Sequence, residues 1–238
     1  MLKTSVIGLG NMGSGIAKNL NSSGLLIGAW NRSSERAKEI QKKYGLNIFS
    51  NIEEMIKNTN FIITSVSEDK DLIEITKKIG PLLPKGAIIL DTSTVRSQTV
   101  IDVADYLKTY DAYFLDGPVS GGKEGAHKGD LVMMVGGEEK ILKKIFPQLK
   151  SFCSKIVHMG NVGSGQKTKA INQIMAAGIN QAVTDSLALA NAEGLDMLKV
   201  IEAVGSGAAG NWFLNHRGSR MQSGSFEPGF KVSLHTKD

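Results

Sequence analysis

Residues 4–15 read Thr-Ser-Val-Ile-Gly-Leu-Gly-Asn-Met-Gly-Ser-Gly, a glycine-rich turn between a β-prone run and the start of a helical pattern. Gly8, Gly10 and Gly13 fit the G-x-G-x-x-G spacing of a dinucleotide-binding βαβ unit. In such a unit the first glycine permits a tight turn, the second lets the backbone approach a pyrophosphate, and the third lets helix and strand pack closely. The N-terminus of the following helix favours negative charge. The motif therefore predicts a bound dinucleotide; a glycine turn without a ligand stays open as the alternative.

The composition is that of an ordinary globular protein, with 238 residues of which 41% are hydrophobic and 21% charged. No apolar run approaches the roughly 18 residues of a membrane span. The N-terminus enters a strand directly, without a basic and then apolar leader. A single cysteine, Cys153, excludes an internal disulfide framework. We therefore expect a cytoplasmic protein without a membrane partner.

The charge pattern and the histidines argue against two further classes of protein. The net charge is +5, but lysine pairs such as Lys42-Lys43 and Lys143-Lys144 are scattered among helical patterns. A nucleic-acid-binding surface would gather them into a stripe with interleaved aromatic residues. The four histidines lie far apart, and none has zinc-ligand spacing with another His or Cys. We expect neither a nucleic-acid partner nor a metal site.

Short apolar runs alternate with helical patterns through the first two-thirds of the chain. This alternation predicts an α/β fold with a parallel sheet that helices cover on both faces. We assign residues 1–162 to this dinucleotide-binding domain. The expected strands are 4–7, 25–30, 47–49, 61–66, 87–90, 112–115, 131–135 and 155–158, and the expected helices are 13–22, 34–44, 52–57, 70–80, 97–109 and 138–149.

A second region, residues 163–238, is almost entirely helix or loop. Gly163-Ser164-Gly165 opens a helical stretch that continues to about Glu193, and a second helix is expected over 196–204. So short a helical region is small for a self-sufficient core. We therefore expect a partial all-helical domain that is truncated at its C-terminal end.

The end of the second expected strand indicates which dinucleotide binds. An NAD site places an acidic residue there for the ribose 2′-hydroxyl, but this chain has Asn31, Arg32 and Ser33. A guanidinium can grip a 2′-phosphate with its planar fork, and serine adds a hydroxyl donor. We predict NADP, with NAD as the alternative; a solvated turn with an incidental arginine stays open.

Two later stretches of sequence contain candidate substrate-binding and catalytic residues. Asp116-Gly117-Pro118-Val119-Ser120-Gly121-Gly122 follows an expected strand and offers backbone N–H groups beside a hydroxyl, which suits a carboxylate, although a plain turn would also explain it. Within residues 163–172, Lys169 and Asn172 fall on one helix face at i and i+3. A lysine is usually a solvated surface charge, but its pairing with an amide on an apolar helix favours a functional role.

These segments together resemble the β-hydroxyacid dehydrogenase family, which includes 3-hydroxyisobutyrate dehydrogenase, tartronate semialdehyde reductase and the glyoxylate/succinic semialdehyde reductases. The resemblance covers the whole chain and rests on five motifs in order: 8–13, Asp91-Thr92-Ser93-Thr94, 116–122, 163–172 and Lys237-Asp238. It implies a Rossmann-like domain, an all-helical domain and an active site in the cleft between them. It also implies hydride transfer between NADP(H) and a small hydroxyacid, semialdehyde or 2-oxoacid that carries a carboxylate.

The resemblance also assigns residues. Lys169 matches the catalytic lysine, and Asn172 matches the residue that orients the substrate beside it. Ser120, Gly121 and Gly122 match the substrate-carboxylate loop, and Ser93 the adjoining substrate contact. With the glycine turn and the end of the second strand, the expected cofactor-binding residues are Gly8, Leu9, Gly10, Asn11, Met12, Gly13, Asn31, Arg32, Ser33, Val66, Thr94, Phe230 and Lys237.

The chain departs from the family pattern in two places. Gln173 follows Asn172 where the family often has a second asparagine, and the family's helical domain continues beyond the Lys-Asp pair. The second departure leaves a non-catalytic dinucleotide-binding module of the same fold as the alternative. An imine-reducing relative would carry another residue at the position of Lys169. By resemblance we expect a homodimer or homotetramer.

Overall fold

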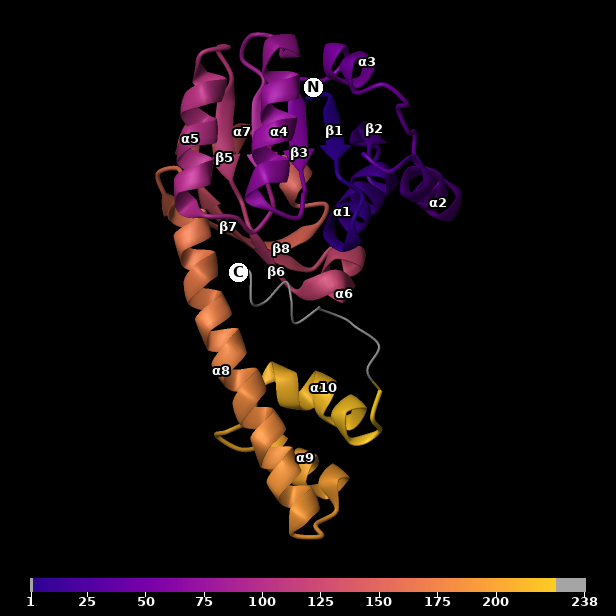
Figure 1. Ribbon diagram of the computed structural model, residues 1–238, viewed down its shortest axis with the longest axis vertical. Helices are drawn as coiled ribbons and strands as arrows, with labels where there is room; N and C mark the ends of the chain where they lie inside the picture. The colour runs from indigo at the N-terminus through magenta and orange to yellow at the C-terminus, as the bar shows by residue number, and fades with distance from the viewer. Residues whose placement is uncertain (1, 226–238) are drawn as a thin grey trace. The chain divides into compact units, whose positions relative to one another are not determined.

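The computed structural model describes residues 2–225, shown in Figure 1. It contains a strand-rich unit and a helical unit, which separate after Lys169. The helix that begins the expected second region starts at Ser164, so it opens within the first unit. The domain boundary expected between residues 162 and 163 stays a prediction.

One sheet of eight strands forms the centre of the first unit, in the order β2-β1-β3-β4-β5-β7-β6 with β8 beside β7. The pairs from β2 to β5 are parallel, as is the β7–β8 pair, whereas β7 runs antiparallel to β5 and β6. The strands are β1 (Thr4–Ile7), β2 (Leu26–Trp30), β3 (Phe61–Thr64), β4 (Ile88–Asp91), β5 (Tyr113–Asp116), β6 (Val119–Ser120), β7 (Leu131–Gly136) and β8 (Cys153–Gly160).

Helices pack on both faces of this sheet, and the strand side chains show why. Successive residues of a strand point to opposite faces. Phe61 and Ile63 of β3 accordingly join one apolar cluster, while Ile62 joins the other. The first cluster lies under α1 (Asn11–Ser22), α2 (Ser34–Tyr44), α6 (Gly122–Lys128) and α7 (Glu139–Leu149); the second lies under α3 (Ile52–Lys57), α4 (Asp69–Ile79) and α5 (Ser97–Lys108). The short 3₁₀ helix η1 (Gly80–Leu82) follows α4.

The expected Rossmann-like α/β architecture is confirmed, with corrections at particular strands. Residues 47–49 form only an isolated bridge between Ile48 and Ala29 rather than a full strand. The sheet is not wholly parallel, because β7 runs antiparallel to β5 and β6; the connection from β5 to β7 contains β6 and the short helix α6. The sequence patterns also missed β6 and α6, which are too short to show a period.

The second unit is helical. Helix α8 (Ser164–Ala192) is followed by α9 (Met197–Gly205) and α10 (Trp212–Gln222). A small apolar cluster joins them through Val183, Leu187 and Leu214. Helix α9 begins at a clear cap, where the carboxylate of Asp196 accepts the N–H groups of Leu198 and Lys199. Within residues 2–225, no helix combines the length and the apolar character that crossing a membrane would require.

Helices α1 and α6 are in close contact at Gly15, which has no side chain to separate them. A Cβ on Gly15 would lie 2.6 Å from the carbonyl carbon of Ala126 and 2.7 Å from its oxygen. Two α1 side chains reinforce the contact, because Asn19 Nδ2 donates to Ala126 O at 2.7 Å and Lys18 Nζ donates to His127 O at 2.9 Å. The helix that follows residues 120–122 is therefore fixed directly to the helix that follows the glycine turn.

We expect Gly15→Ala to lower the free energy of unfolding by about 1–3 kcal/mol, because the new methyl group meets backbone atoms that cannot rotate away. Urea titration measures this change. Gly178→Ala in α8 is the matched control: in the described part of the chain, nothing lies within 4 Å of a Cβ there. Alanine should raise stability at Gly178 by about 0.5–1 kcal/mol. A Gly15→Ala protein as stable as the parent would contradict the described contact.

Candidate functional site

The glycine turn after β1 is closed against neighbouring backbone. Gly8 has φ +94°, and a Cβ there would lie 2.1 Å from Ser65 O at the end of β3. A Cβ on Gly13 would lie 2.0 Å from Gly8 O. Around Gly10, by contrast, no atom of residues 2–225 other than Gly10 and its two chain neighbours lies within 4 Å of the position of a Cβ. Two of the glycines thus allow tight packing, and the third leaves open space beside the backbone.

Helix α1 starts at this open space. Gly10 is its N-cap residue and supplies no side-chain cap, and the first turn carries no acidic residue. Asn11 and Met12 are its first two residues, and Gly13 is buried behind them. The N–H groups of a first helical turn have no partner within the helix, and the helix dipole makes that end positive. This cradle fits the pyrophosphate of a dinucleotide.

Asn31 braces the turn from the end of β2. Its Oδ1 accepts the N–H of Leu9 at 2.8 Å, and its Nδ2 donates to Ser33 O at 3.0 Å. Ser33 in turn caps α2, because its hydroxyl accepts the N–H of Arg36 at 3.2 Å. Asn31 therefore joins the glycine turn directly to the residues expected to bind the adenosine end.

Two arginines lie at this end of the site, and the sequence patterns found only one. Arg32 forms an ion pair with Asp71 of α4, with 2.8 Å between NH1 and Oδ1, while its side chain stays 73% exposed. Arg36, which the patterns missed, donates from Nε to Leu9 O at 3.2 Å and pairs with Glu39. The sequence held one sign of Arg36: it lies three residues after Ser33, the cap residue of α2, and so in the first turn of that helix.

A buried carboxylate organises the ends of β3 and β4. Asp91 Oδ1 accepts the hydroxyls of Thr64 and Ser93, both at 2.7 Å. The Ser93 hydroxyl also accepts the N–H of Val66 at 2.8 Å. Since its proton goes to Asp91, the Ser93 oxygen keeps only acceptor capacity for a substrate. Val66, Ser93 and the half-buried Thr94 thus lie on loops that one carboxylate ties together.

Burial raises the pKa of Asp91 to about 6; its bonds from Ser93 and Thr64 act in the opposite direction, and the nearby Asp116 adds to the increase. The second oxygen of Asp91, Oδ2, is buried without a hydrogen-bond partner in the described part of the chain. Asp91 is therefore a titratable group beneath the candidate site rather than a group that faces it.

A second buried carboxylate, Asp116 at the end of β5, holds the start of α8. Its Oδ1 accepts the N–H of Gly163 at 2.7 Å and its Oδ2 accepts the N–H of Gln166 at 2.8 Å. Burial raises the pKa of Asp116, while these backbone donors oppose the increase. Because Asp116 accepts from the first turn of α8, it caps that helix from a separate strand.

The side chain of Gln166 adds a second link. Its Nε2 donates to Ser93 O at 2.8 Å, and its Oε1 accepts the N–H of Val95 at 3.2 Å. Lys169 lies three residues further along α8 and is only 8% exposed. Asn172 follows on the same helix, within the second unit, and donates from Nδ2 to Gln173 Oε1 at 2.9 Å.

The loop expected to hold a carboxylate lies after β5. Ser120 pairs with Val132 of β7, and the exposed Gly121 and Gly122 that follow have φ of +131° and +63°. Successive glycines in such conformations turn backbone N–H groups toward one region of space. Phe230 and Lys237 lie outside the described residues. In the part of the chain that is described, no three His, Cys, Asp or Glu side chains gather as metal ligands would.

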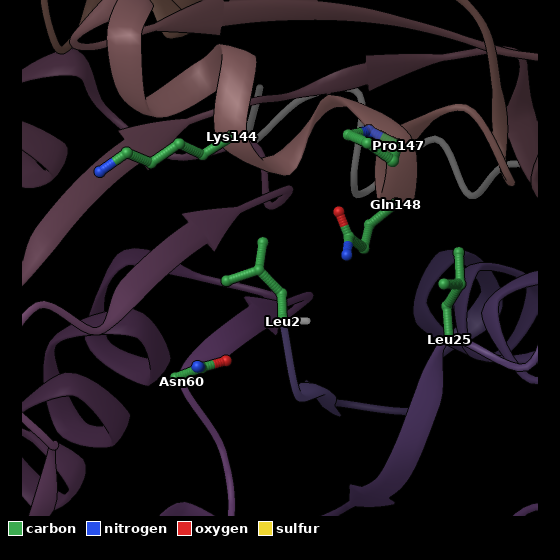
Figure 2. Close-up of a pocket in the computed structure, with 6 residues that line it drawn as sticks. All are labelled: Leu2, Leu25, Asn60, Lys144, Pro147 and Gln148. Atoms are coloured by element: carbon green, nitrogen blue, oxygen red, sulfur yellow. The ribbon is translucent and has the colours of Figure 1, made fainter.

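A hollow of about 560 Å³ lies elsewhere, as Figure 2 shows. Leu2, Leu25 and Asn60 come just before β1, β2 and β3, so the hollow lies at the amino ends of these strands. The glycine turn lies at their carboxyl ends, where ligands of open α/β sheets bind. Gln148 of α7 points into the hollow, and its buried Oε1 has no hydrogen-bond partner in the described structure. The hollow is separate from the candidate site.

Comparison with known proteins agrees with this geometry. Residues 3–160 match the family model described as the NAD binding domain of 6-phosphogluconate dehydrogenase. Residues 163–238 match the model described as NAD-binding of NADP-dependent 3-hydroxyisobutyrate dehydrogenase. An uncharacterized oxidoreductase of Synechocystis sp. is 36% identical over 99% of this chain and 83% of its own length. The chain belongs to the β-hydroxyacid dehydrogenase family.

Other members of the β-hydroxyacid dehydrogenase family are similar over the same length. Glyoxylate/succinic semialdehyde reductase 1 of Arabidopsis thaliana is 25% identical over all of this chain and 83% of its own length. The structure of Mycobacterium tuberculosis 3-hydroxyisobutyrate dehydrogenase with L-serine is 25% identical, has a TM-score of 0.87, and is matched over 84% of its length by this whole chain. The protein is therefore an NAD(P)-dependent dehydrogenase or reductase with a nicotinamide dinucleotide cofactor.

The buried Asp91 carboxyl gives a pH test of the site. Since its folded pKa of about 6 exceeds its usual 3.8, the folded protein binds a proton that the unfolded chain does not. The stability of the parent relative to Asp91→Asn should therefore rise as pH falls from 7.5, by about 1 kcal/mol at pH 5. Urea titrations of both proteins at the two pH values measure this difference. A difference that does not change with pH would exclude the raised pKa.

Proposed function

We propose that this enzyme transfers a hydride between NADP(H) and a small semialdehyde, 2-oxoacid or corresponding hydroxyacid that carries a carboxylate, with Lys169 as general acid and base. One observation supports the proposal above others. Lys169 is buried on α8 one turn after Gln166, whose side chain binds the loop that follows β4. That loop lies at the same edge of the parallel strands as the glycine turn.

The residues that would hold the dinucleotide are Gly8 to Gly13 at the pyrophosphate and Asn31, Arg32 and Ser33 at the adenosine ribose. When bound, the nicotinamide supplies or accepts the hydride. Val66 and Thr94 would flank its ring, because both lie on loops that the Asp91–Ser93 pair holds together. Phe230 and Lys237 stay proposed contacts on the basis of family resemblance.

NADP is favoured over NAD by charge. The residues after β2 include no carboxylate up to Ser34, and the guanidinium groups of Arg32 and Arg36 lie on either side of Ser33 in the sequence. The match of residues 163–238 to the model named for an NADP-dependent enzyme supports the same choice. Asp71 complicates it, because this carboxylate already holds Arg32. Arg32 would have to exchange Asp71 for a phosphate or bind both, and its exposed side chain permits either.

The chemistry of the chain's own residues follows from their charges. Ser120, Gly121 and Gly122 would bind the substrate carboxylate through a hydroxyl and backbone N–H groups. As hydride reaches the carbonyl carbon, negative charge develops on the carbonyl oxygen. The ammonium of Lys169 would stabilise that charge and donate its proton to the oxygen; in the oxidising direction the neutral amine would take the proton back. Asn172 would orient the same oxygen, and Ser93 would accept a hydrogen bond from the substrate.

We further propose that the enzyme is a homodimer or homotetramer. Large apolar side chains of α8 are exposed in the single chain, with Ile171, Ile174 and Met175 at 61%, 74% and 62%. Their spacing places them along one helix face. An apolar face of this kind on a globular protein is typical of a surface that associates with another chain.

Substitution of the two arginines tests the cofactor preference. Arg32→Ala and Arg36→Ala should each raise the KM for NADPH by about 10–100-fold, because each removes a charge-assisted bond to the phosphate worth about 1.5–3 kcal/mol. The KM for NADH should change little. Asp71→Asn should lower the KM for NADPH, since it frees Arg32. Equal effects on both cofactors, or a parent enzyme that prefers NADH, would overturn the assignment.

Lys169→Ala tests the catalytic role. We expect kcat to fall by at least about 10³-fold, because proton transfer and charge stabilisation are lost together, while NADPH binding measured by fluorescence stays nearly unchanged. Lys167→Ala, which removes an exposed lysine of the same helix, is the matched control and should keep full activity.

The assay should follow NADPH consumption with glyoxylate, succinic semialdehyde, tartronate semialdehyde and methylmalonate semialdehyde, and NADP reduction with 3-hydroxyisobutyrate and L-serine. Turnover with at least one of these compounds supports the proposed reaction. No turnover with any of them would favour a non-catalytic dinucleotide-binding protein, and full activity of Lys169→Ala would exclude the role given to Lys169.

A further inference from the structure

Helix α8 has 29 residues, and its first residues, through Lys169, belong to the first unit. The start of α8 therefore sets the position of Lys169. Asp116 holds this start of the helix through the backbone N–H groups of Gly163 and Gln166. Gly165 permits the close approach, since a Cβ there would lie 2.4 Å from Met134 O and 2.7 Å from Asp116 Oδ2. These contacts fix the end of the helix.

Contacts to the backbone at a helix end leave rotation about the helix axis weakly fixed. A side-chain tip about 6 Å from the axis moves by about 1 Å when the helix turns by about 10°. A displacement of about 1 Å at a reacting group can cost about 100-fold in rate. A side chain that leaves α8 and binds the sheet beside it would prevent such a rotation.

Gln166 is such a side chain. It is 3% exposed, and its two amide atoms reach different partners on one loop, the carbonyl of Ser93 and the N–H of Val95. The neutral amide offers a donor to one of these partners and an acceptor to the other at once. Residues 166 and 169 are three apart, so their side chains leave the helix about 60° from each other. A bond that fixes Gln166 therefore also fixes the direction in which Lys169 leaves the helix.

The same loop carries the Ser93 hydroxyl that accepts the N–H of Val66. A continuous chain of hydrogen bonds thus runs from the end of β3 through Ser93 to Gln166 on α8. We propose that Gln166 is a positioning residue for the reaction, which sets the rotation of α8 and thereby the place of Lys169 relative to the loops after β3 and β4. This inference rests on the proposed catalytic role of Lys169.

Gln166→Met tests it, because methionine keeps the length of the side chain and loses both hydrogen bonds. We expect kcat per folded molecule to fall by about 10–100-fold, with the dissociation constant of NADPH changed less than about 2-fold. Gln148→Met is the matched control: Gln148 is another buried glutamine of the first unit, and its side-chain oxygen Oε1 has no hydrogen-bond partner in the described structure. Its kcat should equal that of the parent.

Gln166→Glu gives a second test that does not depend on the stability of the methionine variant. A protonated carboxyl can donate to Ser93 O and accept from Val95 N, whereas a carboxylate would repel the Ser93 carbonyl. The ratio of kcat in Gln166→Glu to kcat in the parent should therefore rise at least about 5-fold from pH 8.5 to pH 5.5. Burial and the carboxylates of Asp91 and Asp116 favour the protonated form of the introduced carboxyl, and Lys169 opposes it. Asp69 and Arg96, which are joined by a hydrogen bond beyond Val95, are closer to solvent.

The outcomes separate the two hypotheses. If the parent reduces a substrate and Lys169→Ala does not, while Gln166→Met keeps its kcat and Gln166→Glu follows the parent at every pH, the positioning role is overturned and the catalytic role stands. If Gln148→Met loses as much kcat as Gln166→Met, the effect belongs to any buried glutamine and the positioning role is again overturned. A loss confined to Gln166 together with recovery of Gln166→Glu in acid supports the inference.

Discussion

The carboxylate of Asp116 is the constraint on which the arrangement of the proposed catalytic helix depends. It lies at the end of β5 with no exposed surface, and its two oxygens accept the N–H of Gly163, just before α8, and the N–H of Gln166 in the first turn of α8. Removal of a carboxylate from water is costly unless hydrogen bonds replace the lost solvation. The helix end provides these bonds and a favourable dipole, and the carboxylate in turn caps the helix end. Each partner therefore satisfies the other, and a helix that continues into the second unit starts from a fixed point on the sheet.

Asp116 is also paired in register with Asp91 on the neighbouring parallel strand. Two buried carboxylates side by side raise each other's affinity for protons, yet each one binds a different set of groups. Asp91 collects hydroxyls from the ends of β3 and β4, and Asp116 collects backbone N–H groups from α8. The sheet edge thus has one carboxylate that binds the loops after β3 and β4 and one that binds the start of α8. Burying these two carboxylates costs electrostatic free energy. Apolar residues could fill the same space without that cost, but they would not hold the neighbouring loops and helix in place.

The sequence predicted most of the sheet and the glycine turn, because strands buried on both faces and a spaced glycine motif leave strong local patterns. What it could not predict are partners far apart in the chain. Arg32 was expected to be available for a phosphate, but its partner Asp71 comes 39 residues later, and the bond from Gln166 to Ser93 spans 73 residues. The spacing of apolar residues within one helix or strand carries no information about such distant partners. The reversal of β7 was missed for a related reason: a strand's direction is set by the length of its connection and by its neighbours, and its own residues carry no sign of it.

The contact of α1 with α6 has a consequence for how this enzyme could change over evolution. The loops proposed to select the cofactor and the loop proposed to select the substrate belong to separate stretches of sequence, so mutations could in principle alter either preference alone. Gly15 limits that independence. Since Gly15 of α1 lies directly against Ala126, any shift of α1 that accommodates a different dinucleotide is transmitted to the helix that begins at Gly122. The residues that set cofactor preference and those that set substrate preference are separate in the sequence, but the contact between α1 and α6 connects them in the structure. Variants selected for a new cofactor should therefore be screened for altered substrate range as well.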